Sequence, residues 1–84
     1  MSAAMTPGPI VDVESVSPLP DYCVSLVFED GKTGVYDVAP LLDKGVFRAL
    51  RNPAVFNAVH VAYGTVAWPG EIDIAPEELY ENCR

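Results

Sequence analysis

Basic residues, histidine and cysteine are all scarce in this chain of 84 residues. It contains five Lys and Arg against 12 Asp and Glu, together with one histidine and two cysteines. The formal charge of −7 at pH 7 repels phosphate backbones and anionic lipid surfaces, which disfavours nucleic-acid binding over the whole surface. Cys23 and Cys83 match no metal or redox spacing, so we expect two reduced thiols rather than a disulfide.

Groups that could perform catalysis are also missing. The single histidine, His60, has no Cys or His partner at ligand spacing, and the sequence has neither a glycine-flanked serine nor a phosphate-binding loop. Glu71 and Asp73 are spaced as neighbours on one face of a strand, where carboxylates are usually solvated. We therefore expect no enzymatic activity, no cofactor and no metal site.

Long apolar runs are absent as well. No segment approaches the roughly 18 apolar residues needed to cross a bilayer, and the N-terminal residues have neither a basic region nor a continuous apolar region. We therefore expect a cytoplasmic protein that does not enter a membrane. Half of the residues are apolar, which is typical of folded chains, and predicts one domain over residues 10–84 after a flexible leader over residues 1–9. A domain this short is marginally stable alone, which favours a homodimer or a partner.

The first half of the chain has the pattern of β-strands. Apolar and polar residues alternate over residues 10–16, which predicts a half-buried strand, and the prolines of residues 17–21 predict a break in regular structure. Alternation over residues 22–29 places Val24, Leu26 and Phe28 on one face. Asp30-Gly31 then fits a tight turn, so residues 33–38 are predicted to be the returning strand of a β-hairpin.

Short helices and short strands are predicted for the second half. Residues 39–52 indicate two helical pieces separated by Gly45, and Asn52-Pro53 is a typical helix start. Further strands are expected over residues 61–63, 65–68 and 72–74, and a last helix begins at Pro76. The fold class that follows is α+β, a small antiparallel β-sheet with a β-hairpin and short helices packed on one face.

One stretch of the chain departs from the acidic character of the rest. Residues 44–70 contain Lys44, Arg48 and Arg51 and no acid, and the spacing places these three on one side of a helix. One interpretation is a solvated helix face that pairs with acids of the last helix. The other is a docking patch for an acidic partner or for a phosphate backbone, which a dimer would double.

The aromatic residues of the last third allow two interpretations. Trp68 lies in an apolar strand next to a proline, where tryptophan is usually part of the core or anchors an interface. If Tyr63, Trp68 and Tyr80 converge in the fold, they instead form an aromatic surface or line a shallow pocket.

An ordered series of short motifs resembles the bacterial family of unknown function DUF2442. The motifs cover about residues 11–82 and follow one another in this order: Ser17-Pro18-Leu19-Pro20-Asp21-Tyr22, Phe28-Glu29-Asp30-Gly31, Tyr36-Asp37-Val38, Pro40-Leu41-Leu42, Gly45-Val46-Phe47 with Leu50, Asn52-Pro53 with Phe56, Gly64-Thr65-Val66, Trp68-Pro69, Ile72-Asp73-Ile74, and Pro76 with Leu79-Tyr80. In this family an aspartate usually precedes the proline of the last helix. This chain has Ala75 there, so we expect the helix to lack its side-chain cap.

The resemblance implies a small cytosolic α+β domain without an established activity, in a family proposed to contain antitoxin-like components. Together with the acidity and small size of the chain, it favours a protein-binding module whose partner is another small, toxin-like protein. The alternative is a nucleic-acid-binding or regulatory domain that acts as a dimer through Lys44, Arg48 and Arg51.

Overall fold

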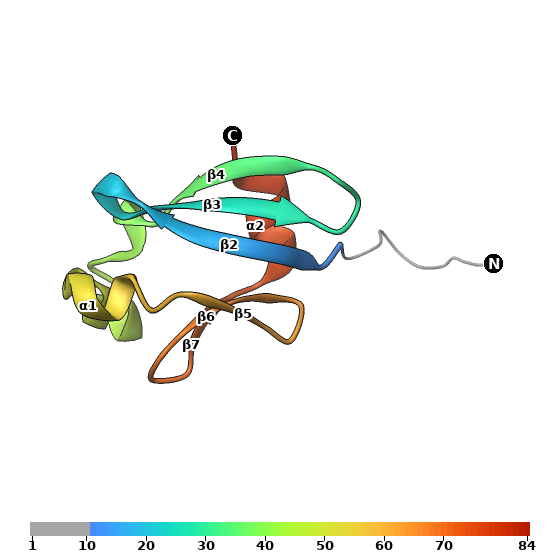
Figure 1. Ribbon diagram of the computed structural model, residues 1–84. Helices are drawn as coiled ribbons and strands as arrows, with labels where there is room; N and C mark the ends of the chain where they lie inside the picture. Colours follow the sequence, from blue (N-terminus) through green and yellow to red (C-terminus); the bar gives the residue numbers. More distant parts are fainter. Residues whose placement is uncertain (1–10) are drawn as a thin grey trace.

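The computed structural model describes residues 11–84, which form two three-stranded antiparallel sheets (Figure 1). The first sheet has the order β2-β3-β4 and the second β5-β6-β7. Their strands are β2 (Val13–Leu19), β3 (Cys23–Phe28), β4 (Thr33–Asp37), β5 (His60–Ala62), β6 (Thr65–Trp68) and β7 (Ile72–Ile74). The predicted α+β class is confirmed, and its strands are divided between two sheets. The leader predicted for residues 1–9 lies outside the described residues.

Within residues 11–84, five short helical segments connect and cover the strands. They are the 3-10 helices η1 (Pro20–Tyr22), η2 (Ala39–Leu41) and η3 (Gly45–Arg51), and the α-helices α1 (Pro53–Phe56) and α2 (Pro76–Asn82). The predicted start of α1 is confirmed, because the Asn52 side chain accepts a hydrogen bond of 3.0 Å from the Ala54 amide. No side-chain hydrogen bond caps α2 at Ala75, as expected.

The β3–β4 hairpin agrees with its sequence pattern. Val24, Leu26 and Phe28 are buried, and the strands are joined by a turn in which Gly31 has a φ of 92°. Only glycine adopts that angle without strain. The Phe28 amide donates to the Lys32 carbonyl at 2.8 Å and closes the turn.

The break predicted for residues 17–21 is wrong in its position. Strand β2 continues through Ser17 and Pro18 to Leu19, and the chain turns only at η1. Pro18 is tolerated because β2 is an edge strand of the sheet, where an amide hydrogen is not needed on the outer side. The register of β2 against β3 shifts between Val13 and Ser15, so the strand also carries a β-bulge.

The core lies between the two sheets and helix α2. Its buried members are Val13, Val24, Leu26, Phe28, Tyr36, Val38, Leu50, Phe56, Val66, Trp68, Ile72, Ile74 and Leu79. Helix α2 lies behind the first sheet in Figure 1, with the Tyr80 ring set edge-on to Phe28 at a centroid distance of 4.9 Å. The Tyr36 hydroxyl donates to Glu78 on the same helix at 2.8 Å.

The chain end closes the outer edge of β4. The Arg84 amide donates to the Val35 carbonyl at 2.9 Å, and the Arg84 carbonyl accepts from the Val35 amide at 2.8 Å. Close approach of this segment also requires Gly34, because a Cβ atom there would lie 2.5 Å from the Cys83 sulfur. Within residues 11–84 the structure has no helix long and apolar enough to cross a membrane.

Candidate interaction surfaces

An open groove of about 250 Å³ lies where the β2–β3 turn meets α1. Residues from two distant parts of the chain line it: Leu19, Pro20, Asp21, Tyr22, Pro53, Phe56 and Asn57. Separate patterns predict a turn at the first segment and a helix start at the second, and neither pattern indicates that the two segments meet. The groove was therefore missed by sequence reasoning.

The backbone of the groove is held in an unusual conformation. Asp21 and Tyr22 both have positive φ angles, 63° and 60°, which non-glycine residues adopt at a cost in free energy. Contacts of Tyr22 hold this conformation, since its hydroxyl donates to the Arg51 carbonyl at 2.6 Å. Its ring also meets Phe56 edge-on, with the ring centroids 5.1 Å apart. The wall of the groove is thus fixed from both sides.

Apolar walls and one carboxylate define the chemistry of the groove. Half-buried Tyr22 and the two exposed prolines supply ring surface, and Asp21 and Asn57 are exposed. The Phe56 ring also borders the groove but is only 3% exposed. Asp21 is the only charged residue of the lining. The ion pair found within residues 11–84 joins other residues, so Asp21 has no cationic partner there. Such a groove suits a long side chain that has an apolar stem and a positive end.

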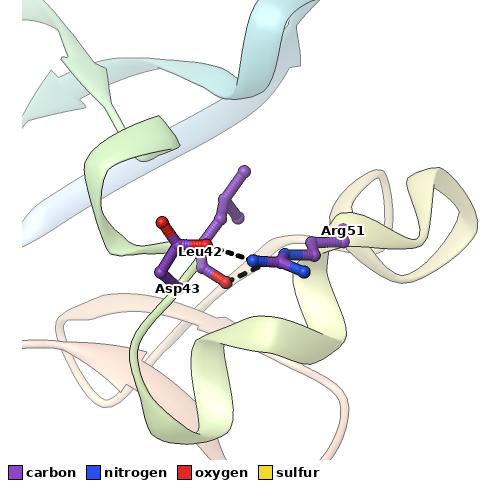
Figure 2. A network of polar contacts seen from close by, with 3 residues as sticks. All are labelled: Leu42, Asp43 and Arg51. Carbon is purple, nitrogen blue, oxygen red and sulfur yellow. Dashed lines mark hydrogen bonds and ion pairs between the residues drawn. The ribbon is translucent and has the colours of Figure 1, made fainter.

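One of the three residues of the predicted basic patch, Arg51, is engaged in local hydrogen bonds and an ion pair. The Arg51 guanidinium donates through Nε to the Leu42 carbonyl at 3.2 Å and through Nη2 to Asp43, as Figure 2 shows. Arg51 therefore pairs with a neighbouring loop and not with acids of the last helix. Arg48 is exposed on the 3-10 helix η3, and Lys44 is exposed at the position just before that helix. Nucleic-acid or acidic-partner binding through Lys44, Arg48 and Arg51 stays a prediction.

The three singled-out aromatic residues have different surroundings. Trp68 is 1% exposed, and its Nε1–H donates to the Phe56 carbonyl at 3.0 Å, so it belongs to the core. Tyr63 is fully exposed at the β5–β6 turn, and Tyr80 is packed on Phe28. None of the three lines the groove.

A polar cluster ties helix α2 to the β3–β4 turn. The Tyr80 hydroxyl donates to Asp30 at 2.6 Å, which lowers the pKa of Asp30 and raises the pKa of Tyr80. The Lys32 ammonium lies 3.9 Å from the centroid of the Tyr80 ring and donates to the Tyr80 carbonyl at 2.7 Å. Lys32 is thereby engaged in the fold.

The residues that could take part in chemistry come from both sheets, from the β6–β7 turn and from the segment after α2. His60 is exposed, with its Nδ1 atom 3.0 Å from the Ala58 carbonyl oxygen, and Glu71 and Asp73 are exposed as predicted. Cys23 and Cys83 are free and half-buried. Among residues 11–84 no group of three His, Cys, Asp or Glu side chains is placed to hold a metal ion.

Fold and surface together define a small acidic α+β domain with an apolar groove beside one sheet. Residues 13–84 match the family described as a protein of unknown function, DUF2442. The chain belongs to this family, which confirms the resemblance seen in its motifs. No curated protein and no solved structure matches the chain significantly.

Proposed function

We propose that this protein is a cytoplasmic, non-catalytic binding module that takes a basic segment of another small protein into the groove beside Asp21. The observation that carries the proposal is a lone carboxylate next to half-buried Tyr22 and the exposed rings of Pro20 and Pro53 in a concave site. A lysine or arginine of the partner would lay its methylene stem on Tyr22 and Pro53 and bring its charge to Asp21.

The charge of the whole chain supports a basic partner. At −7, the protein attracts basic surfaces at long range and raises the rate of their encounter. An antitoxin-like role follows from the same chemistry, because an acidic domain can cover a basic surface that a toxin-like partner needs for its own action. The groove would then fix the orientation of the complex.

The substitution Asp21→Asn tests the proposal with little disturbance of the fold. Asparagine tolerates positive φ angles as aspartate does, so the substitution removes the charge and keeps the turn. Peptides selected from a random display library on the native protein, with the Asp21→Asn variant used for counter-selection, should be enriched in lysine or arginine. Their affinity should fall about two- to fivefold in the variant, which is typical for an exposed ion pair.

Glu71→Gln provides a matched control. Glu71 is also an exposed acid with a positive φ, 63°, but it lies at the β6–β7 turn, away from the groove lining. Glu71→Gln also removes one negative charge. The change in peptide affinity that it causes therefore measures only the long-range effect of net charge. Selected peptides without basic residues, or equal losses of affinity in the two variants, would contradict the proposal.

A further inference from the structure

The outer face of the first sheet is a regular array of nine side chains. The strand registers set three rows across β2, β3 and β4: Ser15, Val27 and Thr33; Ser17, Ser25 and Val35; Leu19, Cys23 and Asp37. We call these nine residues the outer sheet face. The opposite face carries the buried residues of β3 and receives helix α2.

Apolar residues of the outer sheet face are left without a covering layer. Val27 and Val35 are half-buried by their neighbours in the sheet. They are not among the partly buried residues that pack against the core of residues 11–84. Two valines, a leucine and a cysteine thus lie on a sheet face that no described element covers.

The outer sheet face is almost free of charge, in contrast to the rest of the molecule. Of the 12 acids and five bases of the chain, only Asp37 lies in the array. The Asp37 carboxylate accepts a hydrogen bond of 3.0 Å from the Ala39 amide, and the Cys23 sulfur lies 3.9 Å from it. A partner that recognises the molecule by charge would therefore not select this face.

We propose that the outer sheet face binds a second copy of this chain, sheet on sheet, around a two-fold axis. Two copies with a charge of −7 each repel one another, and the repulsion is smallest where neither brings charged side chains. A neutral face is therefore the place where like copies can meet.

The position of Asp37 fits two-fold symmetry. Asp37 occupies a corner of the array, and Ser25 occupies its centre. One possible two-fold axis passes through Ser25 and runs along the strands; it places Asp37 of one copy over Leu19 of the other. A second possible axis passes through Ser25 and runs across the strands; it places Asp37 of one copy over Thr33 of the other. In neither arrangement does one Asp37 lie over the other.

Pairing through sheet edges is a less suitable route to a dimer. The outer edge of β4 is already paired with Arg84. The β2 edge carries Pro18 and a β-bulge, both of which oppose the addition of another strand. Face-to-face packing, with sheets about 10 Å apart, avoids both obstacles.

The size of the outer sheet face predicts a weak dimer. Three strands spaced about 4.8 Å apart, each presenting three side chains, cover only roughly 250 Å² of flat area per copy. Stable interfaces bury about 800 Å² per partner. We therefore expect dissociation constants of roughly 0.1 to 1 mM, and association that strengthens with salt as the repulsion is screened.

Sedimentation analysis over a range of concentrations tests the proposal directly. The native chain should move from monomer toward dimer mass as concentration rises to about 1 mM. Val27→Lys should weaken association at least about tenfold, because it would bury an unpaired charge in the interface. Lysine also lowers the net negative charge of each copy. If net charge alone decided the outcome, Val27→Lys would strengthen association instead of weakening it. Ser25→Lys serves as a second variant, and thermal melting shows that each is folded.

Val46→Lys is the matched control, because Val46 is 62% exposed on η3 and lies outside the array. Val46→Lys also lowers the net negative charge, so it should associate as strongly as the native chain or slightly more strongly. A native chain that stays monomeric to about 1 mM at high salt would overturn the proposal. So would Val27→Lys and Ser25→Lys variants that associate normally, or a Val46→Lys variant that loses association equally. These results are independent of peptide binding at Asp21, so either proposal can fail alone.

Discussion

At Trp68, one side chain combines core packing with a buried hydrogen bond. The indole is 1% exposed, its ring centroid lies 6.1 Å from that of Phe56, and its Nε1–H donates to the Phe56 carbonyl. Phe56 also receives the ring of Tyr22, which forms part of the groove wall. Trp68 therefore supports the candidate site through Phe56 without reaching it.

Trp68→Phe should destabilise the protein by about 2 to 3 kcal/mol. The smaller ring leaves a cavity, and the Phe56 carbonyl loses the shorter of its two hydrogen bonds, since the Val59 amide also donates to it at 3.2 Å. Urea unfolding measures the change. Tyr63→Phe, at a fully exposed aromatic position, should change the free energy of unfolding by less than about 0.5 kcal/mol. Equal effects of the two substitutions would show that Trp68 does not have the role described.

Tyr36 should make stability depend on pH in the alkaline range. Burial, followed by the hydrogen bond to Glu78, raises the pKa of Tyr36 from 10.0 to about 12. The folded state then holds the proton more tightly than the unfolded state, so this stabilisation is present below pH 10 and is lost as the pH rises toward 12. The loss amounts to about 2 kcal/mol near pH 12.

The comparison that isolates this effect is between the native protein and Tyr36→Phe. Phenylalanine keeps the ring and has no proton to lose, so its unfolding free energy should fall less steeply over the same pH range. Parallel curves for the two proteins would contradict the assignment.

At the scale of elements, local signals predicted what local interactions determine. The β3–β4 hairpin follows from alternation and a Gly31 turn, and α1 follows from the Asn52 cap. The continuation of β2 through Pro18 could not be predicted, because it depends on β2 being an edge strand. Whether a strand lies at an edge is decided by tertiary structure.

The candidate site was even harder to predict from sequence, because it is formed entirely by tertiary contacts. Asp21 and Phe56 belong to the same groove, yet they come from segments far apart in the sequence. Lys44 and Arg48 are exposed, but their role as a binding patch stays a prediction. The pair between Arg51 and Asp43 was not predicted, because Asp43 lies just before the stretch without acids. Contacts between distant segments carry no periodic signal in one sequence.

Helix α2 should gain stability from a side-chain cap. Ala75 precedes Pro76 with an extended backbone, φ −59° and ψ 138°, and offers no acceptor to the free amides of the first turn. Ala75→Asp should raise the free energy of unfolding by about 1 kcal/mol. Ala75→Asn should do nearly as well, which separates the cap from the effect of charge on the helix dipole. Denaturant unfolding in which neither variant gains stability would contradict this account.

At the scale of the whole molecule, excess negative charge opposes the compact state. Salt should therefore stabilise the protein, and we expect the melting temperature to rise by a few degrees between about 0.01 M and 0.15 M NaCl. Glu81→Lys should reduce this dependence, because it replaces one repelling charge and places a lysine one helical turn from Glu77. A melting temperature that falls with salt in the native protein would show that attractive pairs dominate instead.

The net negative charge also explains why the two proposed surfaces suit different partners. The groove beside Asp21 is suited to a basic partner, whereas the outer sheet face around Ser25 and Val27 is suited to an identical copy. Only Leu19 belongs to both. A dimer would therefore leave most of each groove accessible and present two of them to a partner.

Amide NMR spectra recorded during titration with a selected basic peptide test the central claim most directly. The largest shift changes should fall on Asp21, Tyr22 and Asn57, and at the same peptide concentration they should be clearly smaller in Asp21→Asn. Changes that cluster instead around Lys44 and Arg48, or on the outer sheet face, would contradict the claim that the groove is the binding site.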